Sequence, residues 1–267
     1  MFTLIISGVI GLGLFLGLWR TDAAAWGWAL FFGVLAFLGC NTAVGLLLKN
    51  KIKKLMDQVQ ATLVSGQKQM QEKANAWRFR PPGSPKQAQM EMQKLQHMFV
   101  AKALEQTCVF EPYLNWVPLL GRQISTMRMQ LNYQDRNYAE VDRLMPKCLF
   151  MDPVSMSMRL ARMYVNKDPK LDDFFEKSVR KLRYGQGAVI YGLYAWIAVK
   201  RDDVDAALKI LLRAAKKMEN ETIKRNIEVL QNNKPKQFSL AGLGDEWYAL
   251  NLEEPRIKMQ RGPQRPF

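Results

Sequence analysis

Two long uncharged stretches occupy the beginning of the chain and restrict its environment more than any other feature. Residues 2–19 and residues 23–48 contain no Asp, Glu, Lys or Arg. A helix of about 20 apolar residues is long enough to cross the hydrocarbon core of a bilayer. Trp19, Trp26 and Trp28 flank the short connection between the stretches, as expected of an interfacial aromatic belt. Residues 1–48 are therefore predicted to form a transmembrane hairpin.

Lysines after the second stretch predict the orientation of this hairpin. Four of them follow it directly: Lys49, Lys51, Lys53 and Lys54. The positive-inside rule therefore places residues 49 onward, and both termini, in the cytoplasm, as parts of an integral membrane protein with two spans. The same lysines are expected to meet anionic headgroups. A cleaved signal peptide is the competing interpretation of residues 1–20, but they show neither a positive n-region nor a clear cleavage site.

Glycines in the first stretch offer a helix-packing motif. Gly13 and Gly17 form a GxxxG pair, and small residues at this spacing let membrane helices approach closely. Glycine is also common in membrane helices in general, so the pair has a second interpretation that involves no contact. We expect the bilayer to surround these glycines and the Trp-flanked spans.

The charge of the protein lies outside the two stretches. The chain of 267 residues carries a net charge of +15, and each Lys or Arg near an anionic surface contributes about 1 kcal/mol of attraction. A basic domain resting against the inner face of its own membrane fits this charge. Nucleic acid is a weaker candidate partner, because the positive residues are scattered among acidic ones and form no recognition motif.

Motifs of catalysis and of cofactor or metal binding are missing from the sequence. The 3 cysteines are far apart, and 1 histidine cannot build a histidine-based metal centre. Phosphate-binding, dinucleotide-binding and hydrolase motifs do not occur. The acid pairs at 172–173 and 202–203 fall near expected helix starts, where capping explains them. The prediction is a protein that is not an enzyme and that holds no cofactor or metal.

Helical periodicity continues beyond the spans. Apolar positions in residues 49–79 predict a membrane-proximal helix, and residues 80–87 (RPPGSPKQ) predict a linker. Ser84 as N-cap, Pro85 as first helical residue and Gln87 as its partner form a strong helix-start signal. Residues 88–235 are predicted to form a helical-repeat domain.

Regular breaks divide this domain into helical pairs. From about residue 117 they fall near 134–137, 151–154, 166–169, 185–187, 200–203 and 218–221. Two helices then make a unit of about 34 residues, the period of an α-solenoid. No stretch alternates with the period of a strand, so the predicted fold is all-α: two transmembrane helices followed by an α-solenoid.

Two of these units resemble the tetratricopeptide repeat. Its aromatic, small, bulky and Asp-Pro positions are matched in the first unit by Tyr138, Val141, Met145, Cys148, Asp152 and Pro153. In another unit the aromatic, small and apolar positions are matched by Tyr191, Ala195, Ala198, Ala207, Leu211 and Ala214. The intervening unit departs from the pattern, with Phe174 or Phe175 where alanine is usual. The resemblance covers residues 117–235 and implies tetratricopeptide-like helical pairs that bind protein partners.

The resemblance also implies which residues contact a partner. Ligands of such repeats meet the first helix of each pair, and the matching positions here are Gln130, Tyr133, Trp196 and Lys200. For Trp196 core packing, and for Lys200 a solvated charge, are the alternatives. Residues 236–254 are predicted to be a C-terminal cap or a docking segment, with Trp247 and Tyr248 as anchors, and residues 255–267 a disordered basic tail.

The predicted function is that of a membrane-anchored scaffold or adaptor. Its cytoplasmic helical repeats would bind protein partners and assemble or regulate a membrane complex. The alternative is an obligate structural subunit of a multi-protein membrane machine, and a weaker one is a nucleic-acid binder.

Overall fold

The computed structural model describes residues 2–21, 26–79, 83–117 and 119–254. Over these residues the protein is helical and contains no strand, which confirms the all-α prediction. The chain divides into two compact units, a first unit (Met1–Leu149) and a second unit (Phe150–Phe267). The division falls inside the range 88–235 that was expected to be one repeat domain. The predicted tail at 255–267 lies outside the described residues.

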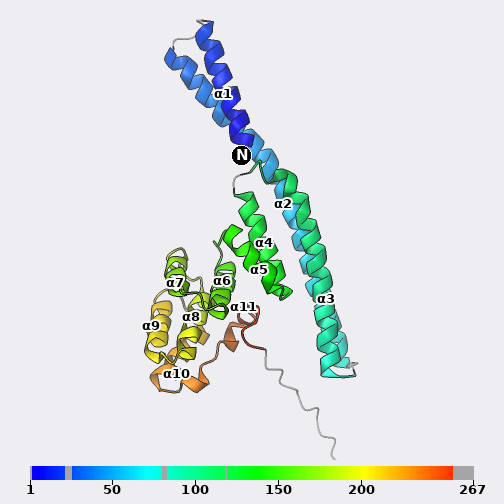
Figure 1. Ribbon diagram of the computed structural model, residues 1–267, viewed down its shortest axis with the longest axis vertical. Helices are drawn as coiled ribbons and strands as arrows, with labels where there is room; N and C mark the ends of the chain where they lie inside the picture. Colours follow the sequence, from blue (N-terminus) through cyan, green and yellow to red (C-terminus); the bar gives the residue numbers. More distant parts are fainter. Residues whose placement is uncertain (1, 22–25, 80–82, 118, 255–267) are drawn as a thin grey trace, which may run out of the picture. The chain divides into compact units, whose positions relative to one another are not determined.

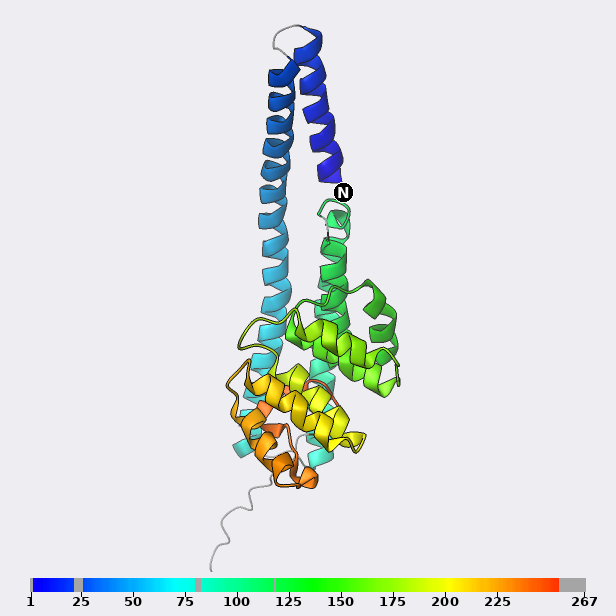
Figure 2. The same cartoon turned by 90° about the vertical axis from the view of Figure 1, so that its left-hand side faces the viewer.

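A helical hairpin opens the first unit. Helix α1 (Phe2–Arg20) runs back along the first part of helix α2 (Trp26–Phe79), as Figures 1 and 2 show. Helix α2 has 54 residues and is therefore about 80 Å long, against about 30 Å for a hydrocarbon core. The predicted second span and the predicted membrane-proximal helix are thus one continuous helix, because no proline interrupts α2 between them.

The hairpin exposes most of its apolar surface. Helices α1 and α2 are both long and apolar enough to cross a membrane, yet only 17% and 6% of their most apolar windows are buried inside the structure. Side chains such as Val9 and Leu47 are 67% and 73% exposed. A core helix of a soluble domain would cover these side chains with its own protein. Over the described residues, most of the apolar surface of the hairpin is therefore left uncovered.

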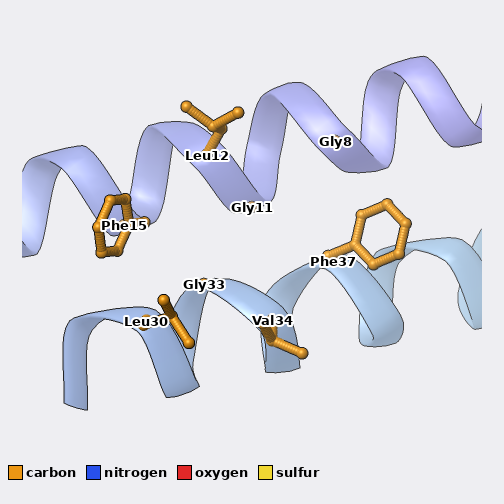
Figure 3. Close-up of a pocket in the computed structure, with 8 residues that line it drawn as sticks. All are labelled: Gly8, Gly11, Leu12, Phe15, Leu30, Gly33, Val34 and Phe37. Atoms are coloured by element: carbon orange, nitrogen blue, oxygen red, sulfur yellow. The ribbon is translucent and has the colours of Figure 1, made fainter. Parts of the chain in front are cut away.

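Two glycines form the crossing point of α1 and α2. A Cβ on Gly11 would meet the carbonyl oxygen of Gly33 at 2.8 Å and the Cβ of Phe37 at 3.0 Å. A Cβ on Gly33 would meet the carbonyl oxygen of Gly11 at 2.9 Å and the Cβ of Phe15 at 3.0 Å. Each helix thus places its phenylalanine beside the glycine of the other (Figure 3). The absence of side chains at both positions allows this close backbone approach.

The GxxxG pair lies elsewhere. No atom stands within 4 Å of a Cβ built on Gly13 or Gly17. The buried side of α1 follows Thr3, Ser7 and Gly11 at four-residue spacing, and a position two residues further along a helix points to the opposite side. The motif therefore takes no part in the α1–α2 contact and faces outward from the hairpin.

Helix α3 (Pro85–Gln106) begins where the sequence predicts and packs against α2. The Ser84 hydroxyl accepts a hydrogen bond from the Gln87 backbone N–H at 3.2 Å, which confirms the predicted N-cap. The helix starts inside the range 80–87 that was predicted as a linker, of which 80–82 lie outside the described residues. The Phe99 ring fills the space beside Gly66, and Lys73 pairs with Glu91 at 2.8 Å. Helices α2 and α3 therefore form a second hairpin in the first unit.

The first unit is completed by shorter elements. They are helix η1 (Thr107–Tyr113), helix α4 (Leu120–Gln134), helix α5 (Tyr138–Leu144) and helix η2 (Met145–Lys147). A shared core joins α2, α3, η1 and α4, and its buried members are Val59, Val100, Ala103, Phe110, Leu120, Ile124 and Leu131. One face of the distal half of α2 is thereby buried by its own protein.

The start of α1 is attached to the segment that leads into α4. The Thr3 hydroxyl donates to the carbonyl oxygen of Trp116 at 2.9 Å, and the Phe2 N–H donates to that of Asn115 at 2.9 Å. The Phe2 and Trp116 rings meet edge to face at 5.6 Å. The hairpin is thus joined to the helical bundle at both α1 and α2.

The second unit is a series of short helices. They are α6 (Pro153–Val165), α7 (Leu171–Val179), α8 (Ala188–Lys200), α9 (Val204–Ala215), α10 (Glu221–Gln231), η3 (Pro235–Gln237), η4 (Ala241–Leu243) and α11 (Asp245–Tyr248). The predicted breaks from 151–154 onward fall between these helices, whereas the pairing of the helices into repeats stays a prediction.

One type of helix ending recurs along the chain. Helices α4, α6, α8 and α10 start at residues 120, 153, 188 and 221, with spacings of 33, 35 and 33 residues. After each of them one residue is left-handed, namely Arg136, Lys167, Asp202 and Asn233. The backbone N–H of the following residue then donates to the carbonyl oxygen five residues earlier, as from Asp203 to Ala198 at 3.0 Å. This Schellman ending turns the chain toward the next helix. The stacking of successive pairs into a solenoid stays a prediction.

The glycine crossing predicts different effects for neighbouring alanine substitutions. Gly11→Ala inserts a methyl group against the backbone of α2 and should destabilise the hairpin by about 1–3 kcal/mol. Gly13→Ala, on the open side of α1, should change its stability by less than about 1 kcal/mol. Amide hydrogen exchange of α1 in the full chain in mild detergent measures both. Equal protection of α1 in the two variants would contradict the crossing.

Candidate functional site

The two predicted partner contacts on α4 differ in accessibility. Tyr133 is only 1% exposed and its ring meets Tyr138 edge to face at 5.5 Å. Gln130 is half-buried. Tyr133 is therefore a core residue of the first unit, and Gln130 is the part of this pair that reaches solvent.

The two predicted contacts on α8 form one cluster. Trp196 is 8% exposed and packs edge to face against Tyr164 at 5.6 Å. The Lys200 ammonium lies 5.2 Å from the centre of the Trp196 ring, a cation–π contact, and stays exposed. Core packing, the alternative considered for Trp196, thus describes its surroundings, whereas Lys200 remains at the surface.

The C-terminal segment (residues 238–254) covers Trp196. Trp247 is fully buried, and its ring lies 5.7 Å from that of Trp196. The indole N–H groups of Trp196 and Trp247 donate to the two oxygens of the Glu253 carboxylate, at 2.8 Å and 3.1 Å. One carboxylate therefore holds both indoles. Tyr248, the second expected anchor, is half-buried.

Further contacts fix the same segment on α8 and α10. The Asn226 side chain donates to the carbonyl oxygen of Ser239 at 2.8 Å and accepts from its N–H at 3.0 Å. Leu240 is fully buried and lies against Gly192, where a Cβ would meet its Cδ2 at 3.0 Å. Residues 238–254 therefore pack against helices of their own unit.

The acid pairs have local structural partners. Asp203 caps α9 by accepting the Ala206 N–H at 2.9 Å. Asp172 accepts the Tyr194 hydroxyl at 2.9 Å and an Arg201 N–H at 3.3 Å. Burial, followed by this bond to Asp172, raises the pKa of Tyr194 to about 12. The described residues hold no group of three or more His, Cys, Asp or Glu side chains that could bind a metal ion.

A basic patch near the ends of α7 and α9 escaped the sequence analysis. Its members, referred to below as the basic patch, are Lys177, Arg180, Lys181, Arg183, Lys216 and Lys217. The two ends meet where the Gly185 N–H donates to the carbonyl oxygen of Lys217 at 2.9 Å. The group at 177–183 and the group at 216–217 are more than 30 positions apart in sequence. Each group taken alone has the pattern of ordinary solvated charge.

One carboxylate, that of Glu176, lies close to the basic patch. Arg213 of α9 donates two hydrogen bonds to Glu176 of α7, at 2.6 Å and 3.1 Å. This bond holds the pKa of Glu176 below its usual value against the effect of burial, and the charges of Arg180 and Lys217 lower that pKa further.

Comparison of the chain with protein-family models, curated proteins and solved structures finds no match. The tetratricopeptide resemblance accordingly stays a prediction from the residues that carry it.

The Glu253 carboxylate, which accepts hydrogen bonds from both indoles, is predicted to hold the C-terminal segment in place. Glu253→Ala leaves two buried indole N–H groups without their acceptor and should destabilise the segment by about 1–3 kcal/mol. Glu254→Ala removes the neighbouring exposed carboxylate and is the matched control. Hydrogen exchange at Ser239 and Leu240 in the full chain should rise only in the first variant. Unchanged exchange in Glu253→Ala would show that the carboxylate does not hold the segment.

The Glu176–Arg213 pair predicts a pH dependence. Because its folded-state pKa is depressed, Glu176 contributes stability above its unfolded pKa, about 4.3, and loses it as the pH falls through the folded value. The pair is partly exposed, so the contribution should be below about 1 kcal/mol. Urea unfolding between about pH 5 and pH 3 should lose more stability in wild type than in Glu176→Gln. A Glu219→Gln control should follow wild type, and parallel curves for wild type and Glu176→Gln would refute the contribution.

Proposed function

We propose that this protein is a membrane-anchored scaffold that holds protein partners beside the cytoplasmic face of a membrane. The hairpin of α1 and α2 supports the anchor, because its exposed side chains are apolar along both helices. The lysines at 49–54 support the orientation through the positive-inside rule. Both termini are then cytoplasmic.

The observation that carries the proposal is the continuity of α2. Its apolar part packs against α1, and its polar part packs against α3, η1 and α4 within one uninterrupted helix. A scaffold benefits from such a connection, because a helix transmits a fixed direction where a flexible linker does not. The bundle around α4 is thereby held at the end of the anchor.

Helical pairs supply the binding surfaces of the proposed scaffold. Repeated pairs commonly offer extended surfaces to other proteins. Since Trp196 and Trp247 are covered, we assign partner binding to the basic patch. The partner should present an acidic surface, because complementary charge favours encounter and orientation.

Charge reversal tests this assignment. Lys181→Glu with Arg183→Glu inverts part of the basic patch and should remove the larger complex seen by blue native electrophoresis of mildly solubilised membranes. Lys234→Glu with Lys236→Glu makes the same charge change at exposed positions of the second unit and should leave the complex intact. Migration of wild type as a free monomer would refute the scaffold proposal.

The outward position of Gly13 and Gly17 favours the alternative of an obligate subunit among other spans. Small residues open toward lipid let a helix of another chain approach α1 closely. In that case Gly13→Leu with Gly17→Leu should remove the larger complex. Lys181→Glu with Arg183→Glu should leave the complex intact. This outcome would replace the scaffold by the structural subunit.

A further inference from the structure

A cavity of about 470 Å³ in the first unit lies where the start of α1, the middle of α2 and the start of α4 meet. Its polar lining includes Thr3, Asn41, Lys49, Lys53, Trp116 and Gln123. Lys49 and Lys53 are its charged residues, and no carboxylate lines it. A concave site with two positive charges and amide groups suits an anion.

The helical period of α2 brings the two lysines together. Asn41, Gly45, Lys49 and Lys53 follow one another at four-residue spacing and so share one face of the helix. Gly45 leaves room above this face, because nothing lies within 4 Å of a Cβ built there. The cavity is thus a consequence of a glycine next to two lysines one turn apart.

The other two lysines of the group point elsewhere. Neither Lys51 nor Lys54 lines the cavity, and the Lys51 ammonium lies 5.6 Å from the centre of the Tyr113 ring. Lys54 is exposed. In the described part of the chain, Lys49 and Lys53 have no carboxylate in ion-pair distance. All four lysines are exposed, and they divide into two that line the cavity, Lys49 and Lys53, and two that do not.

The depth of the cavity points to a lipid. Lys49 directly follows the apolar stretch, whereas Asn41 lies inside it, and the 12 positions from Asn41 to Lys53 cover about 18 Å along a helix. The lining therefore extends from the level of the headgroups into the apolar region and includes Ile52 and Leu120. A free phosphate would use only the basic end, whereas a phospholipid would fill both.

We propose that this cavity is a specific site for an anionic phospholipid, whose phosphate is held between Lys49 and Lys53. The amide of Gln123 donates a hydrogen bond to a headgroup or glycerol oxygen, and the deeper part of the cavity, toward Asn41, takes an acyl chain. This inference rests on the proposed membrane anchor and deepens it. A bound lipid joins α1, α2 and α4 and so couples the anchor to the bundle.

Native mass spectrometry of the full chain in mild detergent tests the site. Phosphatidylglycerol and phosphatidylcholine with the same acyl chains are titrated, and one molecule of phosphatidylglycerol should bind in preference. Lys49→Gln with Lys53→Gln should weaken this binding by at least about tenfold. Lys51→Gln with Lys54→Gln removes the same charge beside the same span and should weaken it by less than about threefold.

A further variant keeps the test independent of the lysine substitutions. Gln123→Glu places a negative charge in the cavity and should also weaken phosphatidylglycerol binding, because like charges repel. Circular dichroism of each variant, compared with wild type, confirms that the helices are retained.

Three results would overturn the site. Equal weakening in the two lysine pairs would mean diffuse attraction, and equal binding of the two lipids would mean no anion site. Displacement of phosphatidylglycerol by inorganic phosphate at equal concentration would identify a soluble anion as the occupant. Carbonate extraction of native membranes separates these failures from that of the anchor, since release of wild type into the supernatant would refute the anchor itself.

Discussion

The continuity of helix α2 is the constraint on which the first unit depends. This helix is covered twice, first by α1 at Gly33 and then by α3, η1 and α4 from Ile52 to Leu63. An uninterrupted helix keeps these two contacts in a fixed rotational relation, because each residue turns the face by a constant angle. The hairpin and the bundle therefore cannot be packed independently of each other.

Close contacts at glycine recur in both units. Gly11 and Gly33 let two backbones meet, Gly66 receives the Phe99 ring and Gly192 receives Leu240. In each place a missing side chain creates the depression that a neighbour fills, which is how packed helices reach short separations. Gly13, Gly17 and Gly45 also lack a side chain, but no neighbouring residue fills the space beside them. These open glycines mark the surfaces where we place other spans or lipid.

The second unit buries the aromatic residues that its sequence suggests as partner contacts. Aromatic side chains on α8 are suited to ligand contact, yet Trp196 is closed by Trp247 and by the shared carboxylate of Glu253. A buried indole needs an acceptor for its N–H, and this requirement fixes the end of the segment as firmly as its apolar burial does. The exposed residues of this unit include the basic patch, to which we assign partner binding.

Much of the helical architecture could be predicted from local patterns. These patterns are the apolar stretches, the N-cap at Ser84 and the breaks between the short helices. Each depends on residues close together in sequence, because caps and turns act over one helical turn. The predicted partner-binding residues could not be assigned from local patterns. Tyr133, Trp196 and Trp247 carry side chains that serve a core or a binding face equally well, and residue type alone does not distinguish these roles.

The sequence by itself determined that the described residues are helical, where most of the breaks between the short helices fall and which stretches are apolar. Only the tertiary structure decided that Gly11, and not Gly13, lies at the α1–α2 crossing, that Lys49 and Lys53 share a cavity while Lys51 does not, and that α3 belongs with α2. The physical reason is the range of the forces involved. Capping and periodicity act within one turn, whereas the choice of a packing partner depends on shapes brought together from distant parts of the chain.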